Sequence, residues 1–429
     1  MNTRAFTGGA GTGKTRSLLR ELENHLAVHP LSAGQRVLAL TFMHGSRHRL
    51  AERLAKSSAR RHFDCITLDH FSWEICHRWR SRLRTLGDLI PLEALDYDGI
   101  CAAAGRLLAC ADVAQWVAKL YPVVVLDEFQ DCAPVRLSLA SHLHGQVEML
   151  IAADDFQNLG CTGECPAILW LRELGVGEEL TTNQRTSDRD LIAAAQALRA
   201  GTALVEGDSS SFKIISAPSP HLAASFVSTT LAPPNGKEAV LLSAARPGTS
   251  PWVDKIVEFI STRKYGKDKK VGPISIRWEM TAEGLVDKMI ATLGIVAGNT
   301  QVEASAILSL PRSPMATQLN RWAEHQRRVL GRNTFSTAEV HAQIRRAAQH
   351  LRSITSVSHD TRRAMTIHQA KNREFLVVIV LWPLRVRGDA TLARRLLYNA
   401  ITRAKRRAIV IVEDPNRNRL NKPPFAYPE

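Results

Sequence analysis

A glycine-rich segment near the N-terminus constrains the fold more than any other feature of the sequence. Residues 8–15 read Gly-Gly-Ala-Gly-Thr-Gly-Lys-Thr and fit the whole pattern G-x-x-x-x-G-K-[ST]. Such glycines let backbone N–H groups close around phosphates, and the positive N-terminus of the next helix points at them. Lys14 is expected to reach the β- and γ-phosphates, and Thr15 to bind Mg²⁺. The predicted nucleotide site consists of Gly8, Gly9, Ala10, Gly11, Thr12, Gly13, Lys14 and Thr15.

An apolar run that ends in two acids supplies the complementary half of such a site. Residues 123–128 read Val-Val-Val-Leu-Asp-Glu, the pattern of a buried strand with carboxylates at its end. Asp127 can stand beside a Mg²⁺ ion held by Thr15, and Glu128 can polarise the attacking water. Alone, a strand ending in Asp-Glu is usually just a solvated strand end. Together with the glycine-rich segment, it indicates hydrolysis of a nucleoside triphosphate.

Strand-like and helical stretches alternate along much of the chain, which predicts an α/β fold with doubly wound parallel sheets. Ligands then bind where the carboxyl ends of the strands meet the following loops. We expect two lobes, residues 1–180 and 181–429. The first should carry a small helical insertion at about 72–120, and the second a mainly helical one at about 278–360. The expected strands include residues 36–42, 121–126, 147–153, 239–243, 375–381 and 407–413.

Composition narrows the class of partner. Lys and Arg number 56 against 41 for Asp and Glu, a net charge of +15 that favours a polyanionic partner. The apolar runs at 123–126 and 376–384 are far shorter than the roughly 20 residues of a membrane-spanning helix. With no apolar signal region at the N-terminus, we expect a cytoplasmic protein without a membrane partner. The seven cysteines are odd in number and scattered, which indicates reduced thiols. Cys161 and Cys165 could supply two metal ligands, but no second Cys or His pair stands at zinc-site spacing.

Seven stretches of the chain resemble motifs of superfamily 1 helicases of the UvrD/PcrA/Rep type. The sequence Asp-Glu-Phe-Gln-Asp at 127–131 resembles the family's DEFQD motif, and Thr-Phe at 41–42 opens a segment like its TFTNKA motif. The motifs follow one another along the chain in the family's order, which makes the resemblance specific. The matching stretches are residues 41–46, 67–71, 127–131, 154–157, 183–187, 365–375 and 397–405. The resemblance implies two RecA-like lobes.

The resemblance also implies roles for individual residues in hydrolysis. Asp127 would complete the metal shell and Glu128 would be the general base. Gln157 would sense the γ-phosphate. Arg185 and Arg403 would be arginine fingers that neutralise charge developing on the transferred phosphoryl group.

Other family positions imply contacts to the ribose and to DNA. Glu374 would contact the ribose of ATP. Thr41 and Thr67 would bind phosphates of single-stranded DNA, and His368 would link DNA to the ATP site. Phe42 would stack on a base, as an aromatic ring can with any base. The alternative for Phe42 is a core side chain at the end of a strand.

The chain departs from the family pattern in several places. Only seven residues precede Gly8, with no glutamine motif that reads adenine, and Gln184 replaces the tyrosine expected to stack on adenine. Strict preference for ATP is therefore left open. The stretch at 158–163 lacks the usual aromatic and arginine, and Asn372 and Arg373 replace Gly-Leu. The accessory insertions are short, which weakens the case for processive unwinding by a monomer.

We therefore expect an ATP-dependent DNA helicase or translocase that uses Mg²⁺ and moves 3′ to 5′ on single-stranded DNA and at junctions with duplex. One alternative is a DNA-stimulated ATPase that serves as a regulatory subunit, with a nuclease or repair factor as partner. Another is an idle binding module, against which the intact Lys14, Thr15, Asp127, Glu128 and Arg403 argue.

Overall fold

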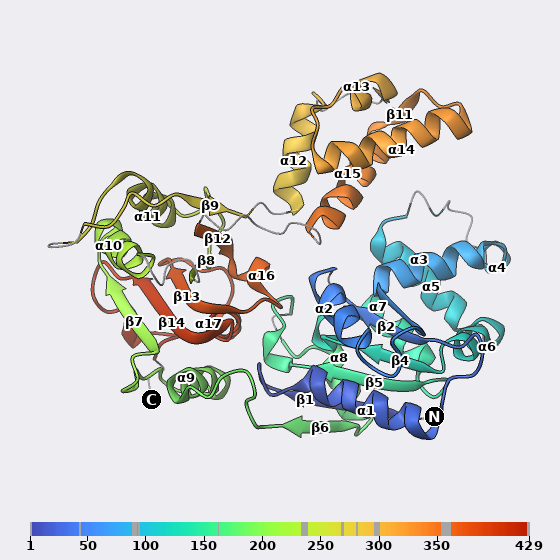
Figure 1. Cartoon of the computed structure of the whole chain (residues 1–429), viewed down its shortest axis with the longest axis horizontal. Helices are drawn as coiled ribbons and strands as arrows, with labels where there is room; N and C mark the ends of the chain where they lie inside the picture. The colour runs from blue at the N-terminus through green and yellow to red at the C-terminus, as the bar shows by residue number, and fades with distance from the viewer. Residues whose placement is uncertain are drawn as a thin grey trace. The chain divides into compact units, whose positions relative to one another are not determined.

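The computed structural model describes residues 2–42, 44–87, 92, 95–161, 163–232, 239–266, 270–279, 282–295, 301–352 and 362–426. They divide into two compact units (Figure 1). The first unit comprises Met1–Arg277 and Arg362–Glu429, and the second comprises Trp278–Thr361. The first unit contains two sheets, which we call the first and second lobes.

The first lobe is built on a six-stranded sheet of order β3-β2-β4-β5-β1-β6. All of its neighbouring strands run parallel. Every residue of β2, β4 and β5 is buried, as expected for strands covered on both faces. The register pairs Thr41 with Thr67, so both residues end their strands at the same edge of the sheet. The strands are β1 (Thr3–Gly8), β2 (Val37–Thr41), β3 (Phe63–Thr67), β4 (Val123–Leu126), β5 (Glu148–Ala153) and β6 (Gly177–Leu180).

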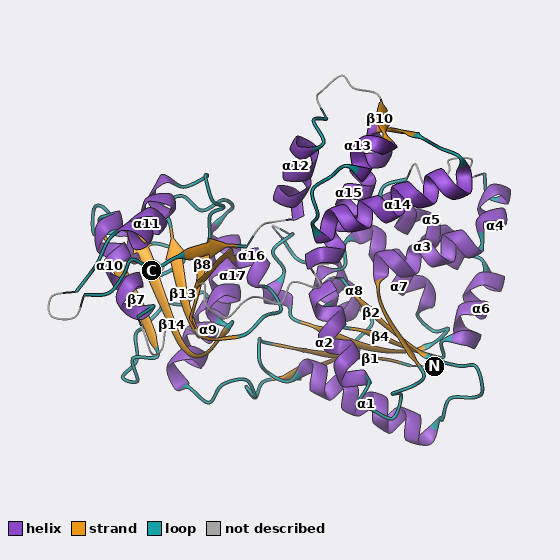
Figure 2. Ribbon diagram, turned by 45° about the horizontal axis from the view of Figure 1, so that its top comes forward, coloured by secondary structure: helices purple, strands orange, loops and turns teal. Residues whose placement is uncertain are grey.

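Helices cover both faces of this sheet (Figure 2). Leu18 and Leu22 of α1 pack with β-strand residues on one face, together with Leu50 of α2. Phe71 of α3 and Leu107 of α5 belong to the core on the opposite face. The helices are α1 (Lys14–Val28), α2 (His44–Leu54), α3 (Leu68–Arg78), α4 (Arg80–Thr85), α5 (Tyr97–Leu108), α6 (Ala111–Leu120), α7 (Pro134–Leu143) and α8 (Pro166–Glu173).

The second lobe has its own six-stranded sheet of order β7-β14-β13-β8-β12-β9. The strand pairs β7–β14, β14–β13, β13–β8 and β8–β12 are parallel, which confirms the predicted class of two doubly wound lobes. The strands are β7 (Phe212–Ala217), β8 (Ala239–Ser243), β9 (Ile276–Trp278), β12 (Arg362–Thr366), β13 (Phe375–Trp382) and β14 (Ala404–Glu413). The helices are α9 (Arg189–Ala200), α10 (Pro220–Thr230), α11 (Pro251–Thr262), α16 (Ile367–Ala370) and α17 (Ala390–Ile401).

The second unit is helical apart from one short antiparallel ladder, in which Val302 pairs with Phe335. Phe335 is fully buried and packs with Leu319 and Ile344 in a core that belongs to this unit alone. The sequence predicts the helices but not the ladder, because three-residue strands are too short for a period of two to be recognised. The elements are α12 (Ala282–Thr292), β10 (Gln301–Glu303), α13 (Ala304–Leu308), α14 (Pro314–Leu330), β11 (Thr334–Ser336) and α15 (Thr337–Arg352).

None of the helices in the described part of the chain is, by itself, long and apolar enough to cross a membrane. Only α5 and α6 together reach that length and composition, and they are bent by 96° relative to each other.

Candidate nucleotide and nucleic-acid sites

The glycine-rich loop joins β1 to α1 in a conformation that only glycine adopts without strain. Gly8 and Gly13 have φ angles of 141° and 86°. A Cβ atom on Gly8 would lie 2.3 Å from the Leu180 carbonyl oxygen, and one on Gly13 would lie 2.6 Å from Gln184 Oε1. Gly13 precedes the first residue of α1, so the unpaired N–H groups of that helix face the loop. Gln184, which stands where the family has tyrosine, covers this end of the helix, and its N–H donates to Gly11 O at 2.6 Å.

Lys14 and Thr15 follow the loop at the start of α1. Lys14 Nζ donates to the Gly8 and Gly9 carbonyl oxygens at 2.9 and 2.7 Å. Thr15 Oγ1 lies 3.3 and 3.4 Å from the two carboxylate oxygens of Asp127. A hydroxyl and a carboxylate side by side fit Mg²⁺, which takes oxygen ligands and leaves its remaining positions to water and phosphate. Burial, and then the charge of Glu128, raise the pKa of Asp127 to about 7. A cation bound beside Asp127 would stabilise its charged form.

Glu128 is held in an uncommon backbone conformation next to Asp127. Its φ angle is 60°, in the left-handed region, where a residue other than glycine costs on the order of 1–3 kcal/mol. Gln130 Nε2 donates to Glu128 Oε2 at 2.6 Å, and Gln130 Oε1 accepts from the Asp154 N–H at 2.8 Å. Gln130 is fully buried and therefore fixes the Glu128 carboxylate. The sequence contains Gln130 within the DEFQD-like motif, but its position alone did not reveal this orienting contact.

Arg185 and Glu374, predicted to act on phosphate and ribose, contact each other. Arg185 Nε lies 2.9 Å from Glu374 Oε1, and Lys405 Nζ lies 2.9 Å from Glu374 Oε2. Burial opposes ionisation of Glu374, yet Arg185 and Lys405 together lower its pKa. Arg185 also donates to the Thr402 carbonyl oxygen at 2.8 Å. The sequence did not predict the contribution of Lys405.

Arg403 is a buried cation whose partners are all uncharged. Its side chain donates to the Asn399 carbonyl oxygen at 3.0 Å and lies 3.2 Å from Thr402 Oγ1. Within the described residues it forms no ion pair, and it is 2% exposed. Burial and the nearby Arg185 lower its pKa to about 10, so the guanidinium remains charged at pH 7. A cation held in this way can stabilise negative charge that develops on a phosphoryl group.

One cavity of about 600 Å³ is lined by Lys14, Thr15, Asp127, Glu128, Arg185, Glu374, Arg403 and Lys405, among others. Its lining carries seven Lys or Arg side chains against three carboxylates, an excess that suits a triphosphate. Gln157 also lines it, and its buried Oε1 has no hydrogen-bond partner among the described residues. Three cationic residues that line the cavity were not predicted, and two of them lie four residues apart on α2 and so share a helix face. They are Arg16, Arg49 and Arg53.

The replacement of the family's glycine by Asn372 has a backbone explanation. Asn372 has a φ angle of 63°. Asparagine adopts the left-handed region more readily than other residues with a side chain, so it can occupy a position where relatives use glycine. Its side chain lines the 600 Å³ cavity next to Glu374.

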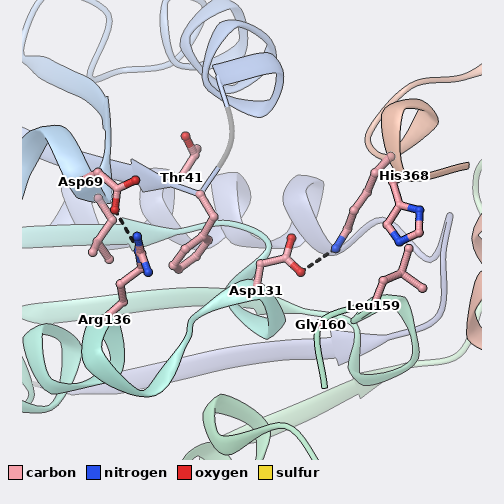
Figure 3. A pocket seen from close by; sticks show the side chains of 10 residues that line it. Thr41, Asp69, Asp131, Arg136, Leu159, Gly160 and His368 are labelled. Carbon is pink, nitrogen blue, oxygen red and sulfur yellow. Dashed lines mark hydrogen bonds and ion pairs between the residues drawn. The ribbon is translucent and has the colours of Figure 1, made fainter. Parts of the chain in front are cut away.

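A second cavity of about 370 Å³ contains three of the four residues predicted to bind DNA (Figure 3). Thr41, Phe42 and His368 line it. Phe42 is half-buried, and its ring lies edge-on to Phe129 at 6.4 Å, so it serves both the core and the cavity. Burial, then Lys371 and Arg246, lower the pKa of His368, which is therefore neutral at pH 7. Thr67 does not line the cavity; its Oγ1 accepts from the His70 N–H and caps α3.

Two ion pairs join side chains that line this second cavity (Figure 3). Arg136 Nε lies 2.8 Å from Asp69 Oδ1. Lys371 Nζ of the second lobe lies 2.5 Å from Asp131 Oδ1 of the first. The second pair connects the acidic motif of one lobe to the segment that carries His368 in the other.

Two family models match segments of this chain. Residues 2–161 match the family model of an AAA domain, and residues 362–411 match that of the UvrD-like helicase C-terminal domain. The chain therefore contains a segment like an AAA domain and, after it, one like the C-terminal domain of UvrD-like helicases. Among solved structures, it is similar to the arterivirus nonstructural protein 10 helicase, with 14% identity and a TM-score of 0.38. The match covers 98% of this chain and 61% of that helicase chain. No curated protein matches significantly.

Four residues join the lobes beside the glycine-rich loop. We call Asp154, Asp155, Arg199 and Tyr398 the interlobe cluster. Arg199 lies 2.8 Å from Asp154 and 2.7 Å from Asp155. The Ala10 N–H donates to Tyr398 Oη at 2.6 Å. Burial opposes the charge on Arg199, but Asp154 and Asp155 raise its pKa. The sequence did not predict Arg199 or Tyr398 in this role.

We expect Arg199→Met to destabilise the protein by about 2 kcal/mol, because it removes an ion-pair partner from the fully buried Asp154. Urea unfolding followed by circular dichroism measures this change. Arg172→Met is the matched control, since Arg172 and Glu164 are 59% and 62% exposed and such pairs contribute about 0–1 kcal/mol. Equal stability of the two variants would contradict a stabilising role for the interlobe cluster.

Proposed function

We propose that the protein is an ATP-driven motor on single-stranded DNA, which moves 3′ to 5′ and opens duplex at junctions. The observation that carries the proposal is that two chain segments line both cavities. Residues 127–131 provide side chains to the 600 Å³ cavity and to the 370 Å³ cavity, and residues 368–374 do the same. The pair Asp131–Lys371 joins these two segments. A conformational change caused by binding or hydrolysis of the nucleotide can therefore be transmitted to the DNA through these two segments.

The proposed hydrolysis uses groups that converge on the larger cavity. Lys14 would leave its carbonyl partners and pair with phosphate oxygens, because a charged acceptor forms the stronger hydrogen bond. Thr15 and Asp127 would hold Mg²⁺, which when bound would neutralise charge on the phosphates. Glu128 would take a proton from the attacking water, and Gln157 Oε1 would accept a hydrogen bond from that water. Arg403 would stabilise the transferred group.

The proposed DNA site is the smaller cavity and the surface around it. Phe42 offers a ring face to a base, and Thr41 and His368 lie beside it. The net charge of +15 favours a nucleic-acid backbone as the partner. Because neutralised phosphates release counterions, binding should weaken steeply as salt is added.

We expect single-stranded DNA to stimulate ATP hydrolysis severalfold, and Phe42→Leu to raise the half-saturating concentration of oligo(dT) about fivefold or more. Leucine keeps an apolar contact with Phe129 but has no ring face for a base. Steady-state phosphate release against oligo(dT) concentration measures both effects. Phe63→Leu is the matched control, because Phe63 is partly buried at the opposite end of β3 from Thr67.

The outcomes separate the possibilities for Phe42 and for the protein. No effect of oligo(dT) on wild-type hydrolysis would refute the motor. Stimulation with equal DNA affinity for wild type and Phe42→Leu would mean that Phe42 acts only as a core residue.

Duplexes with single-stranded tails test the direction and the unwinding. The proposal requires separation of a duplex with a 3′ tail and not of one with a 5′ tail. DNA-stimulated hydrolysis without strand separation would favour the alternative, a regulatory ATPase that acts with a nuclease or repair factor.

A further inference from the structure

Helix α3 exposes three aromatic rings on the face opposite its buried side. Leu68, Phe71 and Ile75 are buried in the core of the first lobe. His70, Trp73 and His77 follow with spacings of three and four residues, which places them on one exposed stripe of the helix. We call these three residues the α3 ladder.

The rings of the α3 ladder are nearly parallel. The ring centroids of Trp73 and His77 are 4.8 Å apart with an interplanar angle of 18°. Those of His70 and Trp73 are 6.4 Å apart at 14°. Trp73 is 39% exposed. A single exposed tryptophan is unremarkable on a protein surface. Here His77 stacks on one face of Trp73 and holds its ring, while the wider 6.4 Å spacing to His70 leaves the other face more open to a flat group.

The charge around the α3 ladder favours an anionic partner. Residues 68–87 contain four arginines and two acids, both of which already have partners: Glu74 lies 3.1 Å from His70, and Asp69 lies 2.8 Å from Arg136. The four arginines, at 78, 80, 82 and 84, are all exposed. Arginines beside exposed aromatic rings are the combination by which proteins bind single-stranded nucleic acid, since the rings stack on bases and the cations follow the backbone.

The α3 ladder continues from the 370 Å³ cavity. Leu68 and Asp69, in the first turn of α3, line that cavity together with Phe42. Trp73 lies four residues beyond Asp69, about 6 Å further along the helix axis. A strand that lies on Phe42 can therefore pass onto α3 without leaving the first lobe.

We propose that the α3 ladder is a second base-stacking site, which binds single-stranded nucleic acid outside the 370 Å³ cavity. This inference rests on the proposed function, because it assumes that a strand occupies that cavity. Trp73 is the principal stacking residue, and His70 and His77 support its ring. The ladder lies outside the nucleotide cavity, so it contributes to nucleic-acid affinity and not to hydrolysis itself.

The test compares full-length wild type, Trp73→Ala and Trp73→Phe in binding a labelled oligo(dT) of about 20 nucleotides, longer than common single-strand site sizes. Fluorescence anisotropy should give about tenfold weaker binding for Trp73→Ala, and less than threefold weaker binding for Trp73→Phe, which keeps a ring. Phe226→Ala is the matched control, because Phe226 is a 36% exposed aromatic residue on α10 of the second lobe. Basal ATP hydrolysis should be equal in all four proteins.

A second probe separates stacking from charge. An abasic oligonucleotide of the same length has the phosphates without the bases, so Trp73→Ala should bind it as wild type does. Equal loss for both probes, or no loss for oligo(dT), would overturn the stacking site. The proposed function would still stand in that case if oligo(dT) stimulates wild-type hydrolysis. If Trp73→Ala is less folded by circular dichroism, His70→Ala combined with His77→Ala replaces it and should weaken oligo(dT) binding at least threefold.

Discussion

Glu128→Gln should lower the rate of ATP hydrolysis by about 10³-fold while nucleotide still binds. Glutamine has nearly the same shape but cannot accept the proton of the attacking water, and a general base contributes about 10²–10⁴-fold. The residues that would hold phosphate and Mg²⁺, Lys14, Thr15 and Asp127, are unchanged. The left-handed backbone at Glu128 is also kept, because the two residues differ only at the end of the side chain.

Phosphate release at saturating ATP and oligo(dT) measures the rate, and a fluorescent ATP analogue measures binding. Glu173→Gln is the control, because Glu173 is an exposed glutamate in the same lobe and should have no effect. If Glu128→Gln retains a tenth or more of the activity, the general base is a different group. If nucleotide binding is lost as well, the substitution has disturbed the metal site beside Asp127.

Arg403→Met should also abolish hydrolysis, yet leave the protein as stable as wild type or more stable. Loss of an arginine finger reduces turnover by about 10³-fold or more. The stability follows from the sign of the pKa shift. In the folded state the pKa of Arg403 is lowered to about 10, below its value in the unfolded chain, so at pH 7 the charge opposes folding by about 3 kcal/mol. An apolar side chain of similar length removes that cost.

Urea unfolding and ATP hydrolysis on the same preparation test this combination. Arg199→Met is the informative contrast, because Arg199 has two carboxylate partners and its loss should destabilise the protein. A clear loss of stability in Arg403→Met would mean that its hydrogen bonds to Asn399 and Thr402 outweigh the cost of burying its charge. Normal hydrolysis would show that Arg403 has no part in the chemistry.

Local sequence patterns predicted most strands that lie in the middle of the sheets. The runs that became β4, β5, β8 and β13 are apolar except for Glu148 and Ser243 at strand ends, because both faces of each strand are largely covered. The edge strand β6 reads Gly-Glu-Glu-Leu and is largely exposed, so it carries no apolar pattern. The strand β7 lies at the other sheet's edge and was not predicted either, since half-buried residues and a following proline obscure it.

The candidate site divides in the same way. The glycine-rich loop, Asp127 and Glu128 are contiguous motifs whose chemistry follows from residue type and spacing. The contact between Ala10 and Tyr398 joins residues 388 positions apart, and no local pattern indicates it. The same holds for Arg199 with Asp154 and for Lys405 with Glu374. Arg199 faces Asp154 because one lobe packs against the other, and Lys405 faces Glu374 because β14 pairs with β13. Neither the packing of the lobes nor the pairing of the strands is specified by a local sequence pattern.

The two cavities with shared walls also have a thermodynamic consequence. When two ligands bind to one protein, the factor by which the first changes the equilibrium affinity for the second equals the factor in the reverse direction. Because residues 127–131 and 368–374 border both cavities, that coupling factor should differ from one. The tightness with which the chain holds a strand would then change at each stage of the nucleotide cycle. A partner protein that bound to either shared segment would change the affinity for the nucleotide and the affinity for the strand together. It would then control the rate of the cycle without contacting the nucleotide.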